Sequence, residues 1–247
     1  MAVQRRQCLQ WAGLLMGGTV LAGLPDAGRS AGKPDAALLK ELRACKPPGN
    51  PLEALMAGNR LFAEAWAAAS GQADDSRRIE ILAQLLASTC QVDPRALAKG
   101  QQPWAALLCC ADSRVAAEMI FTNGSGELFK VSSAGNTAFD EGIASLEYAV
   151  SVLGVSLVLV MGHSDCGAVK SAMGRAPLTP LLEKLVQPIR ASLVSGDDLT
   201  RAIQGNARYA AGQLTARSTV LRDAVAAGRL SIRSAYFDIG SGRVSLL

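Results

Sequence analysis

The sequence has a single histidine among its 247 residues, which narrows the chemistry open to it. Any imidazole that acts as a metal ligand, general base or proton relay must belong to His163. Aromatic residues make up only 4% of the chain, whereas Ala, Leu and Val dominate. This composition favours helices packed on a small parallel sheet and argues against an aromatic-rich β-sandwich.

A strong charge of either sign is also missing. The net charge is +4, and part of the excess falls near the N-terminus, at Arg5, Arg6, Arg29 and Lys33. No run of Lys and Arg is interleaved with aromatic residues, so the sequence gives no support for a nucleic-acid partner.

Residues 1–33 have the layout of a bacterial export signal. The adjacent Arg5 and Arg6 precede an apolar run from Trp11 to Leu24, and small residues follow. Paired arginines are typical of the twin-arginine route, and the run is shorter than the about 20 residues that span a bilayer. We therefore expect export to the periplasm with no stable membrane insertion after signal removal. An uncleaved anchor and a chance apolar N-terminus are the alternatives.

Residues 34–247 are long enough for a single catalytic domain of α/β type. From Leu38 to about Cys90 the pattern is helical, with one helix expected after Asn50 and Pro51 and another over Arg77 to Ala87. These segments carry no chemistry of their own, and we interpret them as an N-terminal helical arm.

The core is predicted to begin with a buried strand at Trp104 to Cys110. A strand at Glu127 to Val131, a helix at Thr137 to Leu153 and a strand at Ser156 to Met161 follow, an order that implies parallel pairing with right-handed crossovers. The fold expected is a central, mostly parallel β-sheet flanked by helices. Further helices are expected at Gly167 to Met173, Pro180 to Leu193 and Thr200 to Ala227, and strands at Leu230 to Ile239 and Arg243 to Leu247.

Two polar segments follow predicted strands, CADSR from Cys110 and HSDC from His163. Open α/β sheets place their sites at such carboxyl ends, so the two segments should lie together. Cys110, His163 and Cys166 then offer three metal ligands and leave a fourth position open, the arrangement of a catalytic zinc site. Iron or cobalt would also suit these ligands. Two buried cysteines and a core histidine are the structural alternative.

Asp112 and Arg114 should project on the same side as Cys110, because side chains alternate along an extended segment. Asp112 can then orient a water molecule at the ion, while Arg114 holds the carboxylate by a bidentate contact. A purely structural ion pair is the alternative.

The CADSR and HSDCG segments resemble the two motifs of the β-class carbonic anhydrase family, CxDSR and HxxCG. The resemblance implies Zn²⁺ bound by Cys110, His163 and Cys166, reversible hydration of carbon dioxide to bicarbonate and a proton, and a homodimer or higher oligomer. In some family members the aspartate equivalent to Asp112 binds the zinc itself. Further similarity lies in GNRLF at 58–62, GELF at 126–129, AGN at 134–136, SLEYAV at 145–150, and AYFD with SGRV near the C-terminus.

Position by position, the resemblance also implies a substrate pocket lined by Gln101, Phe129, Tyr148 and Gly167. The sequence departs from the family at Ser132 and Ser133, where Arg-Asn is usual, and at Ser234, where Gly is frequent. A hydrolase acting on CS₂ or COS would share every ligand, and a non-catalytic zinc-binding or redox-sensing protein is the alternative from another class.

The remaining cysteines are assigned by position. Cys109 should face away from Cys110 and lie in the core, and Cys8 should be lost with the signal. Cys45 and Cys90 are then left outside the site, and we expect a disulfide between them if the protein is exported to an oxidising compartment.

Overall fold

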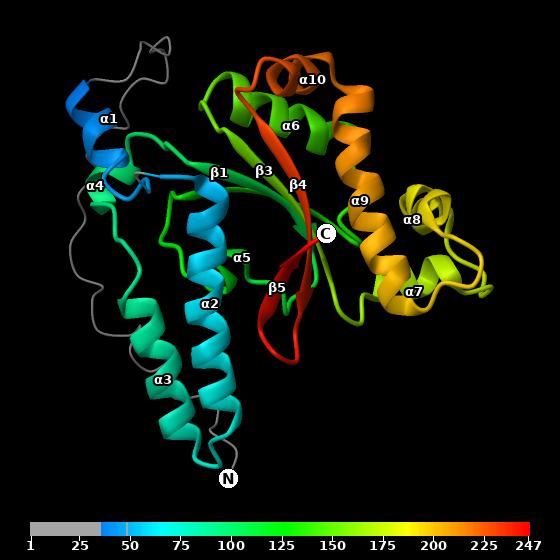
Figure 1. Cartoon of the computed structure of the whole chain (residues 1–247), viewed down its shortest axis with the longest axis horizontal. Helices are drawn as coiled ribbons and strands as arrows, with labels where there is room; N and C mark the ends of the chain where they lie inside the picture. The colour runs from blue at the N-terminus through cyan, green and yellow to red at the C-terminus, as the bar shows by residue number, and fades with distance from the viewer. Residues whose placement is uncertain (1–35, 48) are drawn as a thin grey trace, which may run out of the picture. The chain divides into compact units, whose positions relative to one another are not determined.

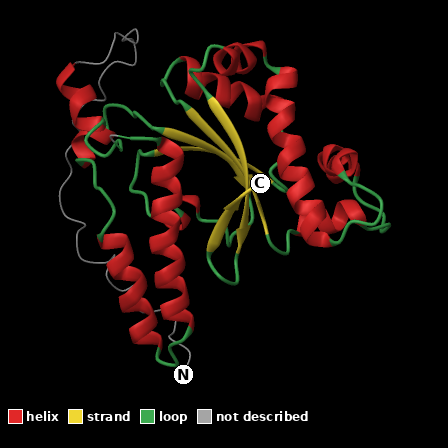
Figure 2. Cartoon of the chain, in the orientation of Figure 1, coloured by secondary structure: helices red, strands yellow, loops and turns green. Residues whose placement is uncertain are grey.

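The structure is a computed structural model that describes residues 36–47 and 49–247 (Figures 1 and 2). The predicted export signal at residues 1–33 lies outside the described residues. Among the helices described, none is both long and apolar enough to cross a membrane.

A five-stranded sheet forms the centre, as predicted, in the order β2-β1-β3-β4-β5. The first four strands in this order are parallel, and β5 pairs antiparallel with β4. The carboxyl ends of β1 and β3 are therefore neighbours at one edge of the sheet. The strands are β1 (Ala105–Cys110), β2 (Leu128–Ser133), β3 (Leu157–His163), β4 (Ser231–Asp238) and β5 (Arg243–Leu246).

Helices cover both faces of the sheet (Figure 2). Helices α2 and α5 pack on one face, and α6, α9 and α10 pack on the other, with α7 and α8 beside α9. In Figure 1, α3 lies along α2 as the outer half of the arm. The helices are α1 (Ala36–Leu42), α2 (Pro51–Ser70), α3 (Asp75–Ala87), α4 (Pro94–Leu97), α5 (Ala117–Ile120), α6 (Asp140–Ser151), α7 (Gly167–Met173), α8 (Pro180–Ser192), α9 (Leu199–Arg217) and α10 (Thr219–Ala226).

Strand β1 is buried along its whole length, and its side chains alternate between two cores. Leu107 and Cys109 join the core beneath α2, whereas Ala106 and Leu108 join the core beneath α6 and α9. Cys109 is thus a core residue, as predicted, and Cys110 points to the opposite face.

Helix α2 is fixed to the sheet by one buried polar side chain, Asn59. Its amide nitrogen donates to the carbonyl oxygens of Ile120 (3.2 Å) and Gly242 (3.0 Å), and its oxygen accepts from the Val244 amide (2.8 Å). The preceding Gly58 allows the close approach, because a Cβ there would lie 1.9 Å from the Phe121 carbonyl oxygen. The GNRLF segment therefore encodes a packing contact.

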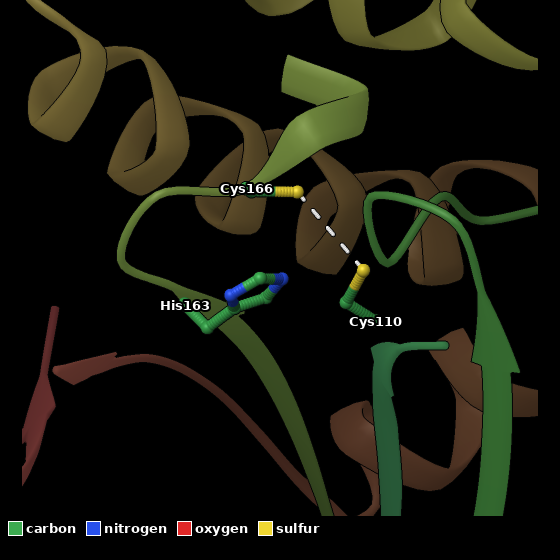
Figure 3. Close-up of side chains that lie close together, drawn as sticks. All are labelled: Cys110, His163 and Cys166. Atoms are coloured by element: carbon green, nitrogen blue, oxygen red, sulfur yellow. Dashed lines mark hydrogen bonds between the residues drawn. The ribbon is translucent and has the colours of Figure 1, made fainter. Parts of the chain in front are cut away.

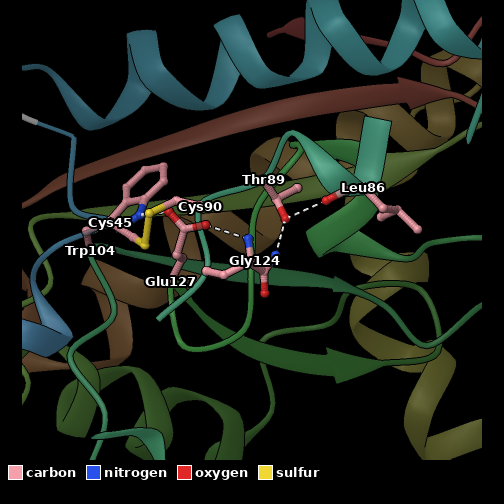
Figure 4. Close-up of a disulfide and its surroundings, with 8 residues drawn as sticks. Cys45, Leu86, Thr89, Cys90, Trp104, Gly124 and Glu127 are labelled. Carbon is pink, nitrogen blue, oxygen red and sulfur yellow. Dashed lines mark hydrogen bonds between the residues drawn. A yellow bond between two sulfur atoms is a disulfide. The ribbon is translucent and has the colours of Figure 1, made fainter. Parts of the chain in front are cut away.

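A disulfide between Cys45 and Cys90 joins the segment after α1 to the segment after α3, as predicted (Figure 4). The two Cα atoms are 5.6 Å apart, within the range that a disulfide can bridge. Beside it, the buried Glu127 accepts hydrogen bonds from Trp104 Nε1 (3.1 Å) and from the Gly124 amide. The disulfide thus joins two segments of the arm, and Glu127 joins the segments that precede β1 and β2.

Besides shifts of one to three residues at the ends of other elements, the structure differs from the expected elements in three respects. Strand β2 extends through Ser133, because Ser132 and Ser133 pair with Cys109 and Cys110 of β1. The long helix expected over Thr200 to Ala227 is two helices, separated at Ser218, whose hydroxyl accepts from the Leu221 amide and caps α10. The short α4 and α5 were not predicted, since four residues give too little periodicity.

Candidate metal centre

Two of the three predicted ligands come from the ends of adjacent strands. Cys110 is the last residue of β1 and His163 is the last residue of β3, and these strands pair in parallel. Cys166 is the residue that directly precedes α7, after a short turn. The βαβ connection therefore brings together residues that are far apart in the sequence.

The turn from His163 to Cys166 depends on a left-handed residue, Asp165, with φ of 60°. Aspartate tolerates this region better than most side chains. Ser164 fixes the turn on the neighbouring strand, since its amide donates to the Phe237 carbonyl (2.8 Å) and its hydroxyl accepts from the Ile239 amide (2.9 Å). The chain is thus folded back so that Cys166 faces Cys110.

The three side chains converge on one point (Figure 3). One ligand atom from each of Cys110, His163 and Cys166 lies within 4.8 Å of the others, and the two Sγ atoms are 4.0 Å apart. Two sulfurs bound at about 2.3 Å to one tetrahedral ion would be about 3.8 Å apart. All three residues are buried, with exposed fractions of 6%, 0% and 1%. The spacing fits a single zinc-sized ion.

His163 has one ring nitrogen engaged and one without a partner. Nδ1 lies 3.0 Å from the carbonyl oxygen of Ser164, which makes Nδ1 the donor and leaves a lone pair on Nε2. Nε2 is buried and has no hydrogen-bond partner among the described residues. An unpaired buried acceptor costs free energy unless a ligand satisfies it, so this tautomer suits metal binding.

Cys110 is supported by a backbone donor. The amide of Gly135 donates to its Sγ at 3.2 Å, which stabilises a thiolate. Gly135 has φ of 78°, and a Cβ there would lie 2.6 Å from Cδ1 of Ile189. Only glycine suits this position, and the AGN segment thereby places an amide against the site.

The two thiols share their protons unequally. A hydrogen bond from Cys166 is the main cause that lowers the pKa of Cys110, to about 4, and the same bond raises the pKa of Cys166. One sulfur is therefore a thiolate near neutral pH, and the second keeps its proton by donating to the first. A divalent cation between the two sulfurs would replace that shared proton and hold both as thiolates.

Asp112 and Arg114 form the predicted bidentate pair at the edge of the cluster. Arg114 Nε and Nη2 donate to the two carboxylate oxygens at 2.9 and 2.7 Å, and its backbone amide donates to Oδ1 at 3.0 Å. The Arg114 side-chain contact is the main cause that lowers the pKa of Asp112, so the carboxylate stays ionised below its ordinary pKa of 3.8. Its Oδ2 lies 3.8 Å from Nε2 of His163. A charged acceptor thus stands beside the ligands.

A second acidic residue, Asp165, also faces Arg114. Arg114 Nη2 lies 3.4 Å from the Asp165 carbonyl oxygen, and Nη1 lies 3.7 Å from its Oδ2. The other carboxylate oxygen of Asp165 is bound by Lys170 on α7, the main cause of the lowered pKa of Asp165. No pattern in the sequence pointed to Asp165 or Lys170 as part of the site. The Gly135 amide was not predicted either, although the AGN segment that contains Gly135 matched the family.

The predicted pocket residues do not all gather at this centre. Gly167 follows Cys166 at the start of α7, whereas Gln101 is exposed on the segment before β1. Since Cys110 ends β1, Gln101 lies at the opposite end of that strand and does not join the cluster within one chain. Phe129 lies on β2 and Tyr148 on α6, and their ring centroids are 6.3 Å apart. Tyr148 is 45% exposed.

The two serines that depart from the family pattern line a cavity of about 560 Å³ between the start of α6 and α8. The Ser133 hydroxyl lies 2.9 Å from Thr137 Oγ1 and accepts from the Thr137 amide at 2.9 Å, whereas Ser132 Oγ lies 3.5 Å from Cys109 Sγ. Cys110, His163 and Cys166 do not line this cavity. The change at these positions therefore leaves the three-residue cluster intact.

The sequence is similar to those of known carbonic anhydrases. A family model described as carbonic anhydrase matches residues 105–244. Carbonic anhydrase 2 of Mycobacterium tuberculosis is 38% identical over 165 residues, covering 63% of this chain and 80% of that protein. The carbonic anhydrase of Pseudomonas aeruginosa is 33% identical over 175 residues, covering 62% and 77%.

Solved structures agree with these relatives. A tetrameric β-carbonic anhydrase from Sordaria macrospora superposes with a TM-score of 0.57 at 26% identity, covering 62% of this chain and 84% of that one. The Coccomyxa β-carbonic anhydrase, solved with acetazolamide, gives a TM-score of 0.57 at 27% identity, covering 62% and 76%.

Proposed function

Since the chain belongs to the β-class carbonic anhydrase family, we propose that it catalyses the reversible hydration of carbon dioxide at a zinc ion held by Cys110, His163 and Cys166. The products are bicarbonate and a proton. The observation that carries the proposal is the buried Nε2 of His163, which lacks a partner among the described residues and belongs to the same cluster as two cysteine sulfurs. A structural histidine would use both ring nitrogens.

Zinc bound with one open position makes a water molecule nucleophilic near neutral pH. The chain's own residues prepare that position. His163 is held in one tautomer by Ser164, and Cys110 is stabilised by the amide of Gly135. Asp112, fixed by Arg114, presents an ionised acceptor that can orient the reacting water toward the substrate carbon.

Apolar side chains surround the ligands and keep bulk water away. Cys110 and Cys166 belong to a buried apolar cluster that includes Val169, Val186, Ile189, Ala202 and Ile203. A dry wall of this kind suits a small, uncharged and poorly hydrated substrate such as carbon dioxide, and it strengthens the electrostatic contacts at the ion.

The direct test is stopped-flow measurement of carbon dioxide hydration, across pH, on protein whose metal content has been determined. We expect hydration to scale with bound zinc and to disappear after chelation. Sulfide release from CS₂ and COS, measured on the same samples, separates the hydrolase that would share these ligands. Sulfide release without carbon dioxide hydration would refute the proposal.

A homodimer or higher oligomer is part of the proposal. The Sordaria macrospora relatives are described as tetrameric. Gln101 lies at the opposite end of β1 from Cys110, so it could line the substrate pocket only of a second copy. Light scattering coupled to size-exclusion chromatography tests the assembly, and a monomer that is fully active would contradict it.

Export to the periplasm is likewise proposed, on the N-terminal pattern around Arg5 and Arg6. The disulfide between Cys45 and Cys90 supports it, because disulfides persist mainly in oxidising compartments. Mass spectrometry of the protein from a periplasmic fraction tests both points, with a mature N-terminus expected near residues 27–31. Recovery of the uncleaved chain from the cytoplasm alone would refute export.

A further inference from the structure

Arg114 is placed between two carboxylates. It holds Asp112 by two side-chain hydrogen bonds of 2.9 and 2.7 Å, while its Nη1 lies 3.7 Å from Oδ2 of Asp165. Its Nη2 also donates to the Asp165 carbonyl oxygen at 3.4 Å. The guanidinium is therefore already in contact with the residue between the ligands His163 and Cys166, and a small rotation would exchange one carboxylate for the other.

Asp112 in turn has two possible partners. Its Oδ2 accepts from Arg114 at 2.7 Å and lies 3.8 Å from Nε2 of His163, the nitrogen that faces the proposed ion. If Oδ2 moves onto the ion, it gives up its contact with Arg114. The released guanidinium then needs a counter-charge, and Asp165 is the carboxylate beside it.

Lys170 already occupies part of Asp165. Its ammonium group binds Oδ1 of Asp165, and the Arg114 guanidinium approaches Oδ2 of the same carboxylate. Two cations thus share one anion. Removal of Lys170 would leave Asp165 free to attract Arg114 more strongly, whereas removal of the Asp165 charge would leave Arg114 with Asp112 alone.

We propose that Asp165 is a second docking position for the Arg114 guanidinium, and that Lys170 competes for it. The balance between these contacts sets how readily Asp112 leaves Arg114 to coordinate the ion. Asp165 and Lys170 are positioning residues in this scheme, since both act through Arg114. The inference deepens the proposed function and rests on an ion being held by Cys110, His163 and Cys166.

The expected effect is modest because the groups are exposed. The side chains of Arg114, Asp165 and Lys170 have exposed fractions of 45%, 59% and 51%. Contacts between exposed charges change an equilibrium by a factor of about two to five. The signs of the changes, which are opposite for the two residues, are therefore more informative than their sizes.

The experiment uses full-length protein loaded with Co²⁺, whose visible absorption reports the coordination sphere. Imidazole is titrated at about pH 8.5, where it is mostly neutral, so that a change in local charge alone does not alter its binding. Imidazole competes with Asp112 for the fourth position. Its half-saturating concentration therefore measures how often Asp112 occupies the ion.

Asp165→Asn should lower that concentration about two- to fivefold, and Lys170→Gln should raise it by a similar factor. Asn keeps the left-handed turn at residue 165, and Lys170→Arg, which keeps the competing charge, should leave the concentration unchanged. No shift, or shifts in the same direction, would overturn the inference and leave the proposed function standing. Failure of the wild-type protein to bind Co²⁺ at this site would overturn both.

Discussion

Asn59 and His163 are both buried polar side chains, and they are satisfied in opposite ways. Asn59, 3% exposed, makes three hydrogen bonds that join α2 to the last residue of α5, to the turn before β5 and to β5 itself. His163, 0% exposed, uses Nδ1 and leaves Nε2 without a partner among the described residues. The hydrogen bonds of Asn59 stabilise the fold, whereas Nε2 of His163 is available to a bound ligand.

The largest effect should follow from Cys166→Ser, which removes a proposed ligand from the metal centre that contains His163. We expect zinc stoichiometry to fall below one and carbon dioxide hydration to drop more than about 100-fold, because even contacts that only support metal ligands are worth 10- to 100-fold. Metal analysis and stopped-flow kinetics measure both. Cys109→Ala, on the opposite face of β1, is the matched control and should keep its metal. Activity retained in Cys166→Ser would refute the ligand assignment.

The next effect concerns the disulfide that closes the arm. Replacing Cys45 and Cys90 together by Ala should lower the free energy of unfolding by about 2–4 kcal/mol, since the bond spans 45 residues and limits the unfolded chain. Urea denaturation measures the loss, and reduction of the wild-type protein with a dithiol should reproduce it. Hydration by the folded variant should be unchanged. A parallel loss of zinc would show that the arm and the centre are not independent.

Asn59→Ala should cost about 2–3 kcal/mol of unfolding free energy, because it strands two carbonyl oxygens and an amide that are now paired. Zinc content should not change. Asn123→Ala is the control in the urea experiment, since Oδ1 of Asn123 already lacks a partner among the described residues, and it should cost less. Equal losses of unfolding free energy in the two variants would show that the three hydrogen bonds of Asn59 do not stabilise the fold.

Asp112→Asn tests the groups beside the ligands. We expect kcat/KM to fall about 10- to 100-fold with zinc retained, since the amide cannot be the charged acceptor that Arg114 positions. Arg114→Lys, which keeps the charge but loses the bidentate contact, should fall about 10-fold. Loss of zinc from Asp112→Asn would instead make Asp112 a resident ligand.

The smallest effect is on proton release. The sole histidine has Nδ1 engaged with Ser164 and Nε2 facing the proposed ion, so neither nitrogen can relay a proton. Turnover should therefore rise with buffer concentration at fixed pH and ionic strength, while kcat/KM stays constant. Rates independent of buffer would point to a relay through another kind of side chain.

Much of this arrangement could be predicted from local patterns. The bounds of α7 agree with the prediction, and β1 and β5 differ from it by one residue each, because turn signals bound their apolar runs. The convergence of Cys110, His163 and Cys166 followed from parallel strands that end at one edge. These features depend on periodicity and topology, which a single sequence expresses directly.

The remaining features arise from contacts between distant segments. No Gly or Pro marks the chain near Ser218, yet α9 ends there, and the Ser218 hydroxyl accepts from the Leu221 amide to cap α10. The Gly135 amide reaches Cys110 only because β2 lies beside β1. Gln101 shows a further limit, since its likeness to a pocket glutamine of the family did not reveal that it lies at the opposite end of β1 from Cys110.

Two cysteine pairs in this chain place opposite demands on their surroundings. Cys45 and Cys90 need an oxidant to form their bond, whereas Cys110 and Cys166, with sulfurs 4.0 Å apart, must stay reduced to bind an ion. A bound ion would hold Cys110 and Cys166 as thiolates and protect them from oxidation while Cys45 and Cys90 form their disulfide. On the export route proposed above, we therefore expect Cys110 and Cys166 to bind their ion before Cys45 and Cys90 meet an oxidant.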